Sequence, residues 1–307
     1  MKAAFYERFG ETDVLQVGEQ PEPPLGPDVV LIRAKATSVN PVDWKIRKGF
    51  LQGAFPHHLP IIPGWDVSGV VEAVGPAVRS GLRPGDEVWA YVRRDDVKFG
   101  TAAEKVIAPE RTVAKKPASL SFEEAAAVPL AGLTAYQCVV EALEVQPGDR
   151  VLVHAASGGV GQFAVQIARS RGAEVIGTSS PKHHDHLRAL GCARVLDYHA
   201  GPISQQLGEK VDAVVDLVGG DALKDAAAQV KDVRRVVSIV DAKTVLALGG
   251  HYVFVRPERA NLDALAALAD AGKLNVDVAE RLPLSRIADA HRLSEQGHTR
   301  GKIVVVI

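Results

Sequence analysis

The clearest chemistry in the sequence lies in a glycine-rich stretch near its middle. The apolar run Val151–Val153 predicts a buried strand, and apolar residues at helical spacing begin a few positions later. Between them Ala155, Gly158 and Gly161 stand at intervals of three. Small residues let the backbone turn tightly and approach a pyrophosphate, while unpaired N–H groups at the helix start face the anion. The order predicts a dinucleotide-binding unit; the alternative is a tight turn that binds nothing. The predicted phosphate contacts are Ser157, Gly158, Gly159, Val160 and Gly161.

A second group of residues bears on which dinucleotide this unit would bind. The run Glu174–Thr178 predicts the second strand of the fold, whose end faces the adenine ribose. NAD-specific folds place an acidic residue there, but residues 178–183 contain hydroxyls and a cation and no carboxylate. These groups suit a 2′-phosphate, so we predict NADPH. Lys182 is either a phosphate contact or a solvated lysine. The candidate contacts are Thr178, Ser179, Ser180 and His183.

Composition limits the class of protein. The 307 residues suffice for two domains, and 47% hydrophobic with 24% charged residues is typical of a globular chain. A net charge of -1 favours neither nucleic acid nor an anionic membrane, and no apolar run predicts a membrane span or signal peptide. The two cysteines, Cys138 and Cys192, predict buried thiols, no disulfide framework and no four-thiolate zinc site. We therefore expect a cytoplasmic protein.

The first 120 or so residues have the pattern of a β-rich domain. Short β-prone runs lie between clusters of proline and glycine, which indicates a small barrel or sandwich. The final run, Lys302–Ile307, is also β-prone, and we expect it to return to the sheet of this domain. The predicted strands are Val29–Ile32, Val67–Val74, Glu87–Tyr91 and Ala103–Ile107.

The pattern changes near Ser121, where Ser121 and Glu124 form a potential capping box. A second helical pattern covers Leu133–Leu143, and strands then alternate with helices. This alternation predicts an α/β fold with a doubly wound parallel sheet. The predicted strands are Val151–His154, Glu174–Thr178, Arg194–Asp197, Asp212–Leu217 and Arg235–Val240, with helices near 160–170, 182–190, 221–230 and 261–272.

Several motifs now support a family resemblance. The chain resembles the medium-chain dehydrogenase/reductase superfamily, and within it the zinc-free quinone oxidoreductase branch that includes ζ-crystallin-like proteins and enone reductases. The match extends over essentially the full length. The motifs that carry it are Asn40–Asp43, Ile46–Gly49, Pro63–Gly69, Pro84–Val88, Gly132–Tyr136, the glycine-rich loop, Asp197–Tyr198 and His298–Lys302.

The resemblance implies a GroES-like catalytic domain, residues 1–122 and 258–307, and an NADP-binding Rossmann domain, residues 123–257. It also implies cofactor contacts beyond the loop: a serine, Ser179 or Ser180, and Tyr198 for the 2′-phosphate. The resemblance implies further residues around the ribose and nicotinamide; alternatively, these residues only pack within strands or helices. Those expected around the ribose and nicotinamide are Thr134, Val218, Gly219, Ser238, Ile239, Phe254 and Val255.

The resemblance also bears on the metal. Zinc alcohol dehydrogenases carry a cysteine near position 40 and a Gly-His-Glu motif, whereas this chain has Asn40 in the first place and Trp65 with Asp66 in the second. Without thiolate or imidazole ligands no Lewis acid is expected, so we predict no metal and disfavour alcohol oxidation.

Reduction of an activated alkene has simpler requirements. A hydride goes to the electrophilic carbon, the carbonyl oxygen gains negative charge, and a proton follows. The candidate groups are the Asn40 amide and the Lys45 ammonium, the latter at a place where related branches carry tyrosine. Alternatively solvent supplies the proton and Lys45 only pairs with Asp43. Trp44 and Trp65 either pack at the domain edge or stack on a planar substrate.

The expected function is therefore zinc-independent, NADPH-dependent reduction of a small quinone or α,β-unsaturated carbonyl. An NADPH-binding or redox-sensing protein with little catalysis, and a biosynthetic enoyl reductase, are the alternatives. The resemblance further implies a homodimer formed by joining sheet edges, here Val245–Leu248 and Tyr252–Val255.

Overall fold

The computed structural model covers residues 1–307 and describes all of them except His298, so that part of the closing motif lies outside the described residues. The chain forms two compact units. Unit 1 consists of Met1–Leu130, Pro257–Asp270 and Val276–Ile307, and unit 2 of Ala131–Arg256 and Ala271–Asn275. No helix in the described part of the chain is long and apolar enough to cross a membrane.

Unit 2 is built on a six-stranded sheet in which all neighbouring strands are parallel. The spatial order is β12-β11-β10-β13-β14-β15. This order confirms the predicted doubly wound sheet, and ligands of such sheets bind where the strand order reverses, beside the first strand. The strands are β10 (Arg150–Val153), β11 (Glu174–Ser179), β12 (Arg194–Asp197), β13 (Ala213–Asp216), β14 (Val236–Ser238) and β15 (His251–Tyr252).

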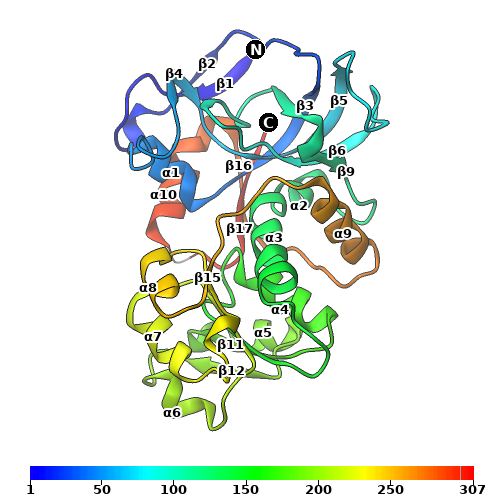
Figure 1. Ribbon diagram of the computed structural model, residues 1–307. Helices are drawn as coiled ribbons and strands as arrows, with labels where there is room; N and C mark the ends of the chain where they lie inside the picture. The colour runs from blue at the N-terminus through cyan, green and yellow to red at the C-terminus, as the bar shows by residue number, and fades with distance from the viewer. Residues whose placement is uncertain (298) are drawn as a thin grey trace. The chain divides into compact units, whose positions relative to one another are not determined.

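Helices cover both faces of this sheet, with α7 and α8 on one side and α4 on the other (Figure 1). An apolar row on the first face includes Leu152, Val214 and Val236, which pack with residues of α6, α7 and α8 in one buried cluster. Each such fully buried side chain stabilises the fold by about 1.5–3 kcal/mol. The helices are α3 (Pro129–Tyr136), which continues as a π-helical segment (Gln137–Ala142), α4 (Gly161–Ser170), α5 (His184–Leu190), α6 (Ile203–Leu207), α7 (Gly220–Ala228) and α8 (Ala242–Ala247).

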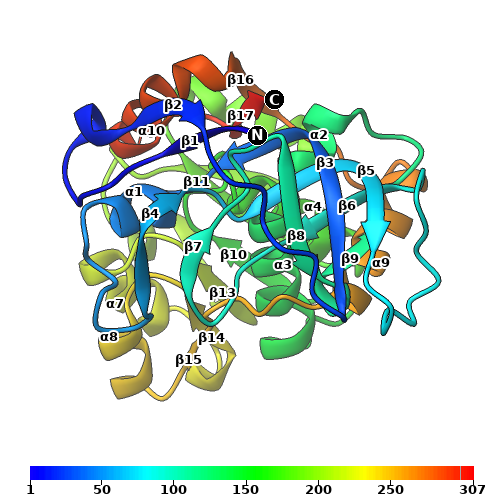
Figure 2. The same cartoon turned by 90° about the horizontal axis from the view of Figure 1, so that it is seen from above.

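Unit 1 is organised by the long strand β3 (Val29–Val39), which pairs with β5, β8 and β17 (Figure 2). The pairing of β17 with β3 confirms that the C-terminal run returns to the sheet of the first domain. The sheet has the order β16-β17-β3-β5-β6-β9, with β8 also on β3. The other strands are β5 (Asp66–Val74), β6 (Glu87–Tyr91), β8 (Lys105–Pro109), β9 (Val113–Lys115), β16 (Val278–Pro283) and β17 (Lys302–Val306).

Two smaller sheets and four helices complete the main elements described for unit 1. β1 (Lys2–Phe5) pairs antiparallel with β2 (Gln16–Glu19), and β4 (His57–Ile62) pairs parallel with β7 (Val97–Phe99). In Figure 1, α1 lies beside α10. The helices are α1 (Pro41–Arg47), α2 (Phe122–Ala126), α9 (Arg259–Asp270) and α10 (Ile287–Gln296).

The capping box at the start of α2 is confirmed. The Ser121 side chain accepts from Glu124 N at 3.2 Å, and Ser121 N donates to the Glu124 carboxylate at 2.9 Å. The expected domain change at residue 122 nevertheless differs from the division into units, which falls after Leu130. The reason is that α2 packs on unit 1, where Ser68 Oγ donates to Phe122 O at 2.5 Å.

One expectation about the second domain is wrong in detail. Val245–Leu248 is not a sheet edge: Asp241 accepts from Thr244 N at 3.0 Å and caps helix α8, so the edge strand is β15. The helix expected at 261–272 is α9, which lies in unit 1 and within the range 258–307 that the resemblance implied for the GroES-like domain; there Ser119 N donates to the Asp270 carboxylate at 3.0 Å.

Candidate functional site

The glycine-rich loop between β10 and α4 turns as tightly as its residue types suggest. Ala155 has a φ of +44°, and its N–H donates to Thr178 Oγ1 at 3.1 Å. Gly158 N donates back to Ala155 O at 2.9 Å. A Cβ on Gly161 would lie 2.3 Å from Ala155 O and 2.7 Å from Ala156 Cα, a distance that real Cβ atoms do not reach. Glycine is therefore required where the loop meets the start of α4.

The same loop presents N–H groups suited to an anion. In the described part of the chain, no acceptor is recorded for the backbone N–H groups of Ser157, Gly159 and Val160. They precede α4, a ten-residue helix, at the carboxyl edge of the parallel sheet. Unpaired N–H groups and the positive end of a helix dipole together stabilise a phosphate.

The residues expected near the 2′-phosphate differ in their accessibility. Thr178 and Ser179 are buried, and their hydroxyls bind Ala155 N and Ser180 O. Ser180 and His183 are half-buried, whereas Tyr198 is exposed. Because Ser179 is in register with Asp197 on β12, Ser180 and Tyr198 follow directly from neighbouring strands.

A buried row of polar side chains orders the other half of this edge; sequence reasoning predicted Ser238 as a site residue but missed His154 and Asp216. Asp216 ends β13; its carboxylate accepts from His154 Nδ1 at 2.8 Å and from Ser238 Oγ at 2.7 Å. It also accepts from the N–H groups of Val218 at 3.2 Å and Gly219 at 3.1 Å. Burial opposes ionisation, but the hydrogen bonds from His154, Ser238 and Gly219 hold the pKa of Asp216 below its usual value. The carboxylate thereby fixes two of the turns expected to line the cofactor. The sequence did contain a signal for this row. Leu152, Val214 and Val236 are paired across neighbouring strands, and the polar residue two positions after each of them lies on the same face of the sheet.

We predict that Asp216→Asn weakens cofactor binding by about tenfold or more, because hydrogen bonds to a charged acceptor contribute about 1.5–3 kcal/mol. Fluorescence titration with NADPH measures the change. Asp232→Asn is the matched control, since Asp232 only pairs with exposed Arg234 in the same unit. An unchanged dissociation constant for Asp216→Asn would show that the turns keep their shape without the carboxylate.

The remaining residues expected around the nicotinamide have mixed environments. Thr134 is buried on α3, and Ser238 and Val255 are buried, whereas Phe254 is exposed. Gln137 adds a contact that the sequence did not predict: its side chain accepts from Arg256 N at 3.0 Å and donates to Arg256 O at 2.9 Å. This pair of hydrogen bonds holds the segment after β15 against the π-helical continuation of α3. Except for Thr134, the predicted cofactor residues all lie at the carboxyl ends of the strands or just beyond them.

In unit 1, Asn40 is the centre of a buried network. Its Nδ2 donates to Asp66 Oδ2 at 2.8 Å, and its Oδ1 accepts from Lys302 Nζ. Lysine only donates and carboxylate only accepts, so these partners determine the orientation of the amide. Asn40 N donates to Asp43 Oδ2 at 2.7 Å, which caps α1. Asn40 is only 2% exposed, and its amide makes its hydrogen bonds within this network.

Lys45 lies on the exposed side of α1, which faces away from the buried network around Asn40. Its Nζ is 5.6 Å from the ring centroid of Trp44, and Lys48 Nζ is 5.7 Å from the same ring. The side chain of Phe50 meets this ring edge-on at 6.4 Å. No Lys45–Asp43 ion pair occurs among the described residues, so the pairing considered from the sequence is not seen. The face of α1 around Trp44 is therefore aromatic and cationic.

Trp65, by contrast, packs inside unit 1. It is 5% exposed and meets Phe55 and Tyr91 edge-on, with ring centroids 6.2 and 6.0 Å away. This environment favours packing over stacking on a substrate. In the part of the chain that the structure describes, no group of three or more His, Cys, Asp or Glu residues could hold a metal ion.

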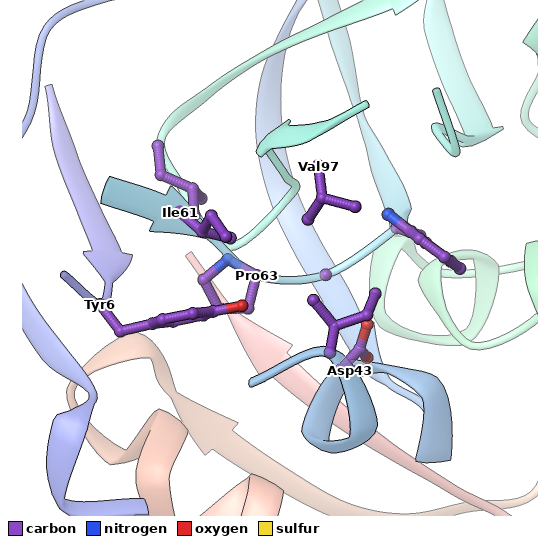
Figure 3. A pocket seen from close by; sticks show the side chains of 9 residues that line it. Tyr6, Asp43, Ile61, Pro63 and Val97 are labelled. Carbon is purple, nitrogen blue, oxygen red and sulfur yellow. The ribbon is translucent and has the colours of Figure 1, made fainter. Parts of the chain in front are cut away.

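A small cavity lies between α1 and the strand β4, and Asp43 and Tyr6 point into it (Figure 3). Asp43 Oδ1 and the Tyr6 hydroxyl have no hydrogen-bond partner among the described residues. Burial is the main reason that the pKa of Asp43 rises to about 7, against the hydrogen bond from Asn40 N. A buried carboxyl next to Asp66 thus takes up a proton near neutral pH.

Comparisons with known proteins agree with this architecture. A model described as "Alcohol dehydrogenase GroES-like domain" matches residues 26–118, and one described as "Zinc-binding dehydrogenase" matches residues 190–305. The chain is 36% identical over 315 residues to an Arabidopsis thaliana protein named "NADPH-dependent alkenal/one oxidoreductase, chloroplastic", covering 99% of this chain and 79% of that protein. It is 32% identical over 325 residues to the "Chloroplast envelope quinone oxidoreductase homolog" of the same plant, covering 99% and 98%.

A solved structure gives the same result. The quinone oxidoreductase from Coxiella burnetii superposes with a TM-score of 0.91 at 34% identity, covering 100% of this chain and 99% of that one. The predicted fold, a GroES-like domain with a doubly wound parallel sheet, is confirmed. The chain therefore belongs to the medium-chain dehydrogenase/reductase superfamily, in its quinone and enone oxidoreductase branch.

Proposed function

We propose that the protein is a zinc-independent reductase that uses NADPH to reduce quinones or α,β-unsaturated carbonyl compounds. The observation that carries this proposal is the combination of two features. Unit 2 contains a loop with unpaired N–H groups and a glycine that no larger residue can replace. Relatives that match the chain along nearly its whole length are named as quinone and alkenal/one oxidoreductases.

The residues of unit 2 fit a nicotinamide dinucleotide. The loop N–H groups of Ser157, Gly159 and Val160 would hold the pyrophosphate. Ser180, His183 and Tyr198 would face a 2′-phosphate, and no carboxylate in residues 178–183 competes with it. The turns fixed by Asp216 would hold the ribose and nicotinamide. We expect Ser180→Asp to favour NADH over NADPH, as measured by the ratio of the two dissociation constants; an unchanged ratio would argue against this phosphate site.

NADPH, when bound, would supply a hydride to the carbon β to the carbonyl group. The protein must then stabilise the negative charge that develops on the carbonyl oxygen and leave a path for a proton to the α-carbon. Lys45 is a cation on the exposed face of α1, so we assign it the electrostatic role. Because the Asn40 amide serves Lys302 and Asp66, we assign Asn40 to holding α1 in place. The exposure of Lys45 favours proton delivery from solvent.

The residues that this chain has at the positions of the zinc ligands in related alcohol dehydrogenases support zinc independence. Asn40 is engaged by Asp66 and Lys302, and Trp65 packs against Phe55 and Tyr91. An amide and an indole supply neither the thiolate nor the imidazole that zinc prefers. The proposed chemistry therefore relies on positioning and fixed charge.

We predict that Lys45→Met lowers kcat for an enone by about 10- to 100-fold, since removal of one group that stabilises an oxyanion costs on this order. The affinity for NADPH should stay within about twofold. Steady-state kinetics with 2-cyclohexenone and NADPH titration measure both values. Lys45→Arg keeps the charge and should retain most activity, and Lys35→Met, on an exposed position of β3, is the control. Wild-type kcat in Lys45→Met would remove Lys45 from the mechanism.

The activity itself is tested by NADPH oxidation at 340 nm across enals, enones and quinones, with products identified by mass spectrometry. The proposal expects a saturated carbonyl or hydroquinone with at least one member of the panel. Tight NADPH binding without turnover of any member would favour a non-catalytic, redox-sensing role.

We also propose that the protein is a cytoplasmic homodimer. The edge strand β15 and its surroundings expose apolar side chains, among them Leu246, Tyr252 and Phe254, and a second copy would cover them. Two buried free cysteines, Cys138 and Cys192, suit a reducing compartment. Analytical ultracentrifugation should give twice the mass of 32.6 kDa, and a monomer at micromolar concentration would exclude the dimer.

A further inference from the structure

Helix α1 is too short to hold its own position. It has seven residues, fewer than an isolated helix needs for stability in water. Asp43, Ile46 and Arg47 form its buried face, while Lys45 is exposed and Trp44 half-buried. The orientation of Trp44 and Lys45 must therefore come from the groups that hold the two ends of the helix.

Both ends are held by residues from the C-terminal part of the chain. At the first end, Lys302 on β17 donates to Asn40 Oδ1 and lies 3.9 Å from Asp66 Oδ2. Lys302 is 4% exposed and Asp66 is fully buried, so this charged pair is shielded from water. Asp66 also accepts from Ser38 Oγ at 2.7 Å, which leaves the Asn40 amide little freedom.

The second end is held by α10, which lies beside α1 (Figure 1). The guanidinium of Arg47, which is fully buried, donates to Glu295 and to His291 Nδ1 at 3.2 Å. Burial, reinforced by Arg47, lowers the pKa of His291 to about 3, so its imidazole is neutral and can accept. Arg47 also donates to Gly10 O at 3.1 Å.

Glu295 connects the second end of α1 to the aromatic and cationic face around Trp44. Besides Arg47 it binds Lys48, whose Nζ is 3.1 Å from its carboxylate. Lys48 in turn lies against the Trp44 ring, on which Lys45 also rests. Lys48 Nζ also lies 2.9 Å from the Glu11 carboxylate, so Glu295 on α10 and Glu11 together place one of the two cations beside Trp44.

We propose that α10 and β17 form a C-terminal brace that orients α1 for catalysis, with Glu295 and Lys302 as its positioning residues. This inference rests on the proposed function. Glu295 acts through Arg47 and Lys48, and Lys302 acts through Asn40; neither needs to touch the substrate. The brace gives the C-terminal segment, far from α1 in sequence, a direct effect on the rate of reduction.

The test compares Glu295→Gln and Lys302→Met with the wild-type enzyme in three measurements: kcat with 2-cyclohexenone, NADPH affinity, and acrylamide quenching of tryptophan fluorescence. Quenching reports on Trp44, because Trp65 and Trp89 are buried. We expect each variant to lower kcat by about tenfold or more, keep NADPH affinity within about twofold, and increase quenching. Asp289→Asn is the control, since it removes exposed ion pairs with Arg292 on α10 and with Arg286 just before this helix, and nothing from α1.

Lys302→Met leaves Asp66 buried without its cation and could fail to fold. In that case the double variant Asp66→Asn/Lys302→Met removes both charges, which buried pairs often tolerate. The brace is refuted if the variants keep wild-type kcat, or if kcat falls only as the folded fraction falls while quenching is unchanged. Wild-type inactivity on every quinone and enone would refute the proposed function instead, and the quenching comparison would still test the brace.

Discussion

Gly161→Ala should weaken NADPH binding by about 100-fold or more. The added Cβ would lie 2.3 Å from Ala155 O and 2.7 Å from Ala156 Cα, and both neighbours are backbone atoms that cannot rotate away. The loop or the start of α4 must move instead, and the N–H groups of Ser157, Gly159 and Val160 would lose their common direction. A loss of this size corresponds to about 2.7 kcal/mol of binding free energy. Isothermal titration with NADPH measures it.

Gly158→Ala provides a graded comparison in the same loop. Its Cβ would lie 3.2 Å from the same carbonyl oxygen, a contact that a shift of a few tenths of an ångström relieves. We expect a loss of about tenfold or less, provided that circular dichroism shows both variants folded. If Gly161→Ala bound NADPH as tightly as the wild type, the loop could not be the pyrophosphate site.

Asp43→Asn should stabilise the protein by a smaller amount near pH 5 and by the full amount above pH 7. The pKa of Asp43 is about 7 in the folded protein, chiefly because of burial, and 3.8 in the unfolded chain. Between these values the folded state holds more protons than the unfolded state, so the free energy of unfolding falls as pH rises. Above pH 7 the folded protein carries the full cost of a buried carboxylate, on the order of 4 kcal/mol.

Asparagine avoids this cost and can still accept from Asn40 N, so the cap of α1 survives. Urea denaturation at several pH values between 5 and 8 measures the difference in unfolding free energy between Asp43→Asn and the wild type. We expect that difference to grow with pH and level off above pH 7. Asp95→Asn, at an exposed position of unit 1, should show no such trend. A difference that is constant across the range would mean that Asp43 is ionised throughout.

The parallel sheet was predictable because its signals are local. The central strands β10, β13 and β14 contain short apolar runs, and the glycine spacing after β10 reflects steric requirements that the structure confirms at Gly161. Val245–Leu248 shows the limit of such signals, because a four-residue apolar run fits a strand or a helix turn equally well. Asp241, four residues before Val245, caps the helix, and an aspartate at this position is the signal that favoured a helix over a strand.

The surroundings of α1 could not be predicted in this way. Asn40 and Lys302 are 262 residues apart, and nothing in either segment alone indicates that they meet. The sequence correctly placed β17 in the first sheet, but not the brace that α10 and β17 form. The role expected for Asn40 therefore changes once its partners are known, whereas the electrostatic role of Lys45 stays a prediction that its exposed side chain allows.

The most direct test of the proposed chemistry follows the transferred hydride. Chelator-treated enzyme is incubated with NADPH deuterated at C4 of the nicotinamide, on either face, and with 2-cyclohexenone, and the product is examined by NMR. The proposal predicts cyclohexanone with one deuterium at the carbon β to the carbonyl, from one face only, at the same rate with and without added zinc. Absence of deuterium at that carbon, or activity that depends on zinc, would contradict it.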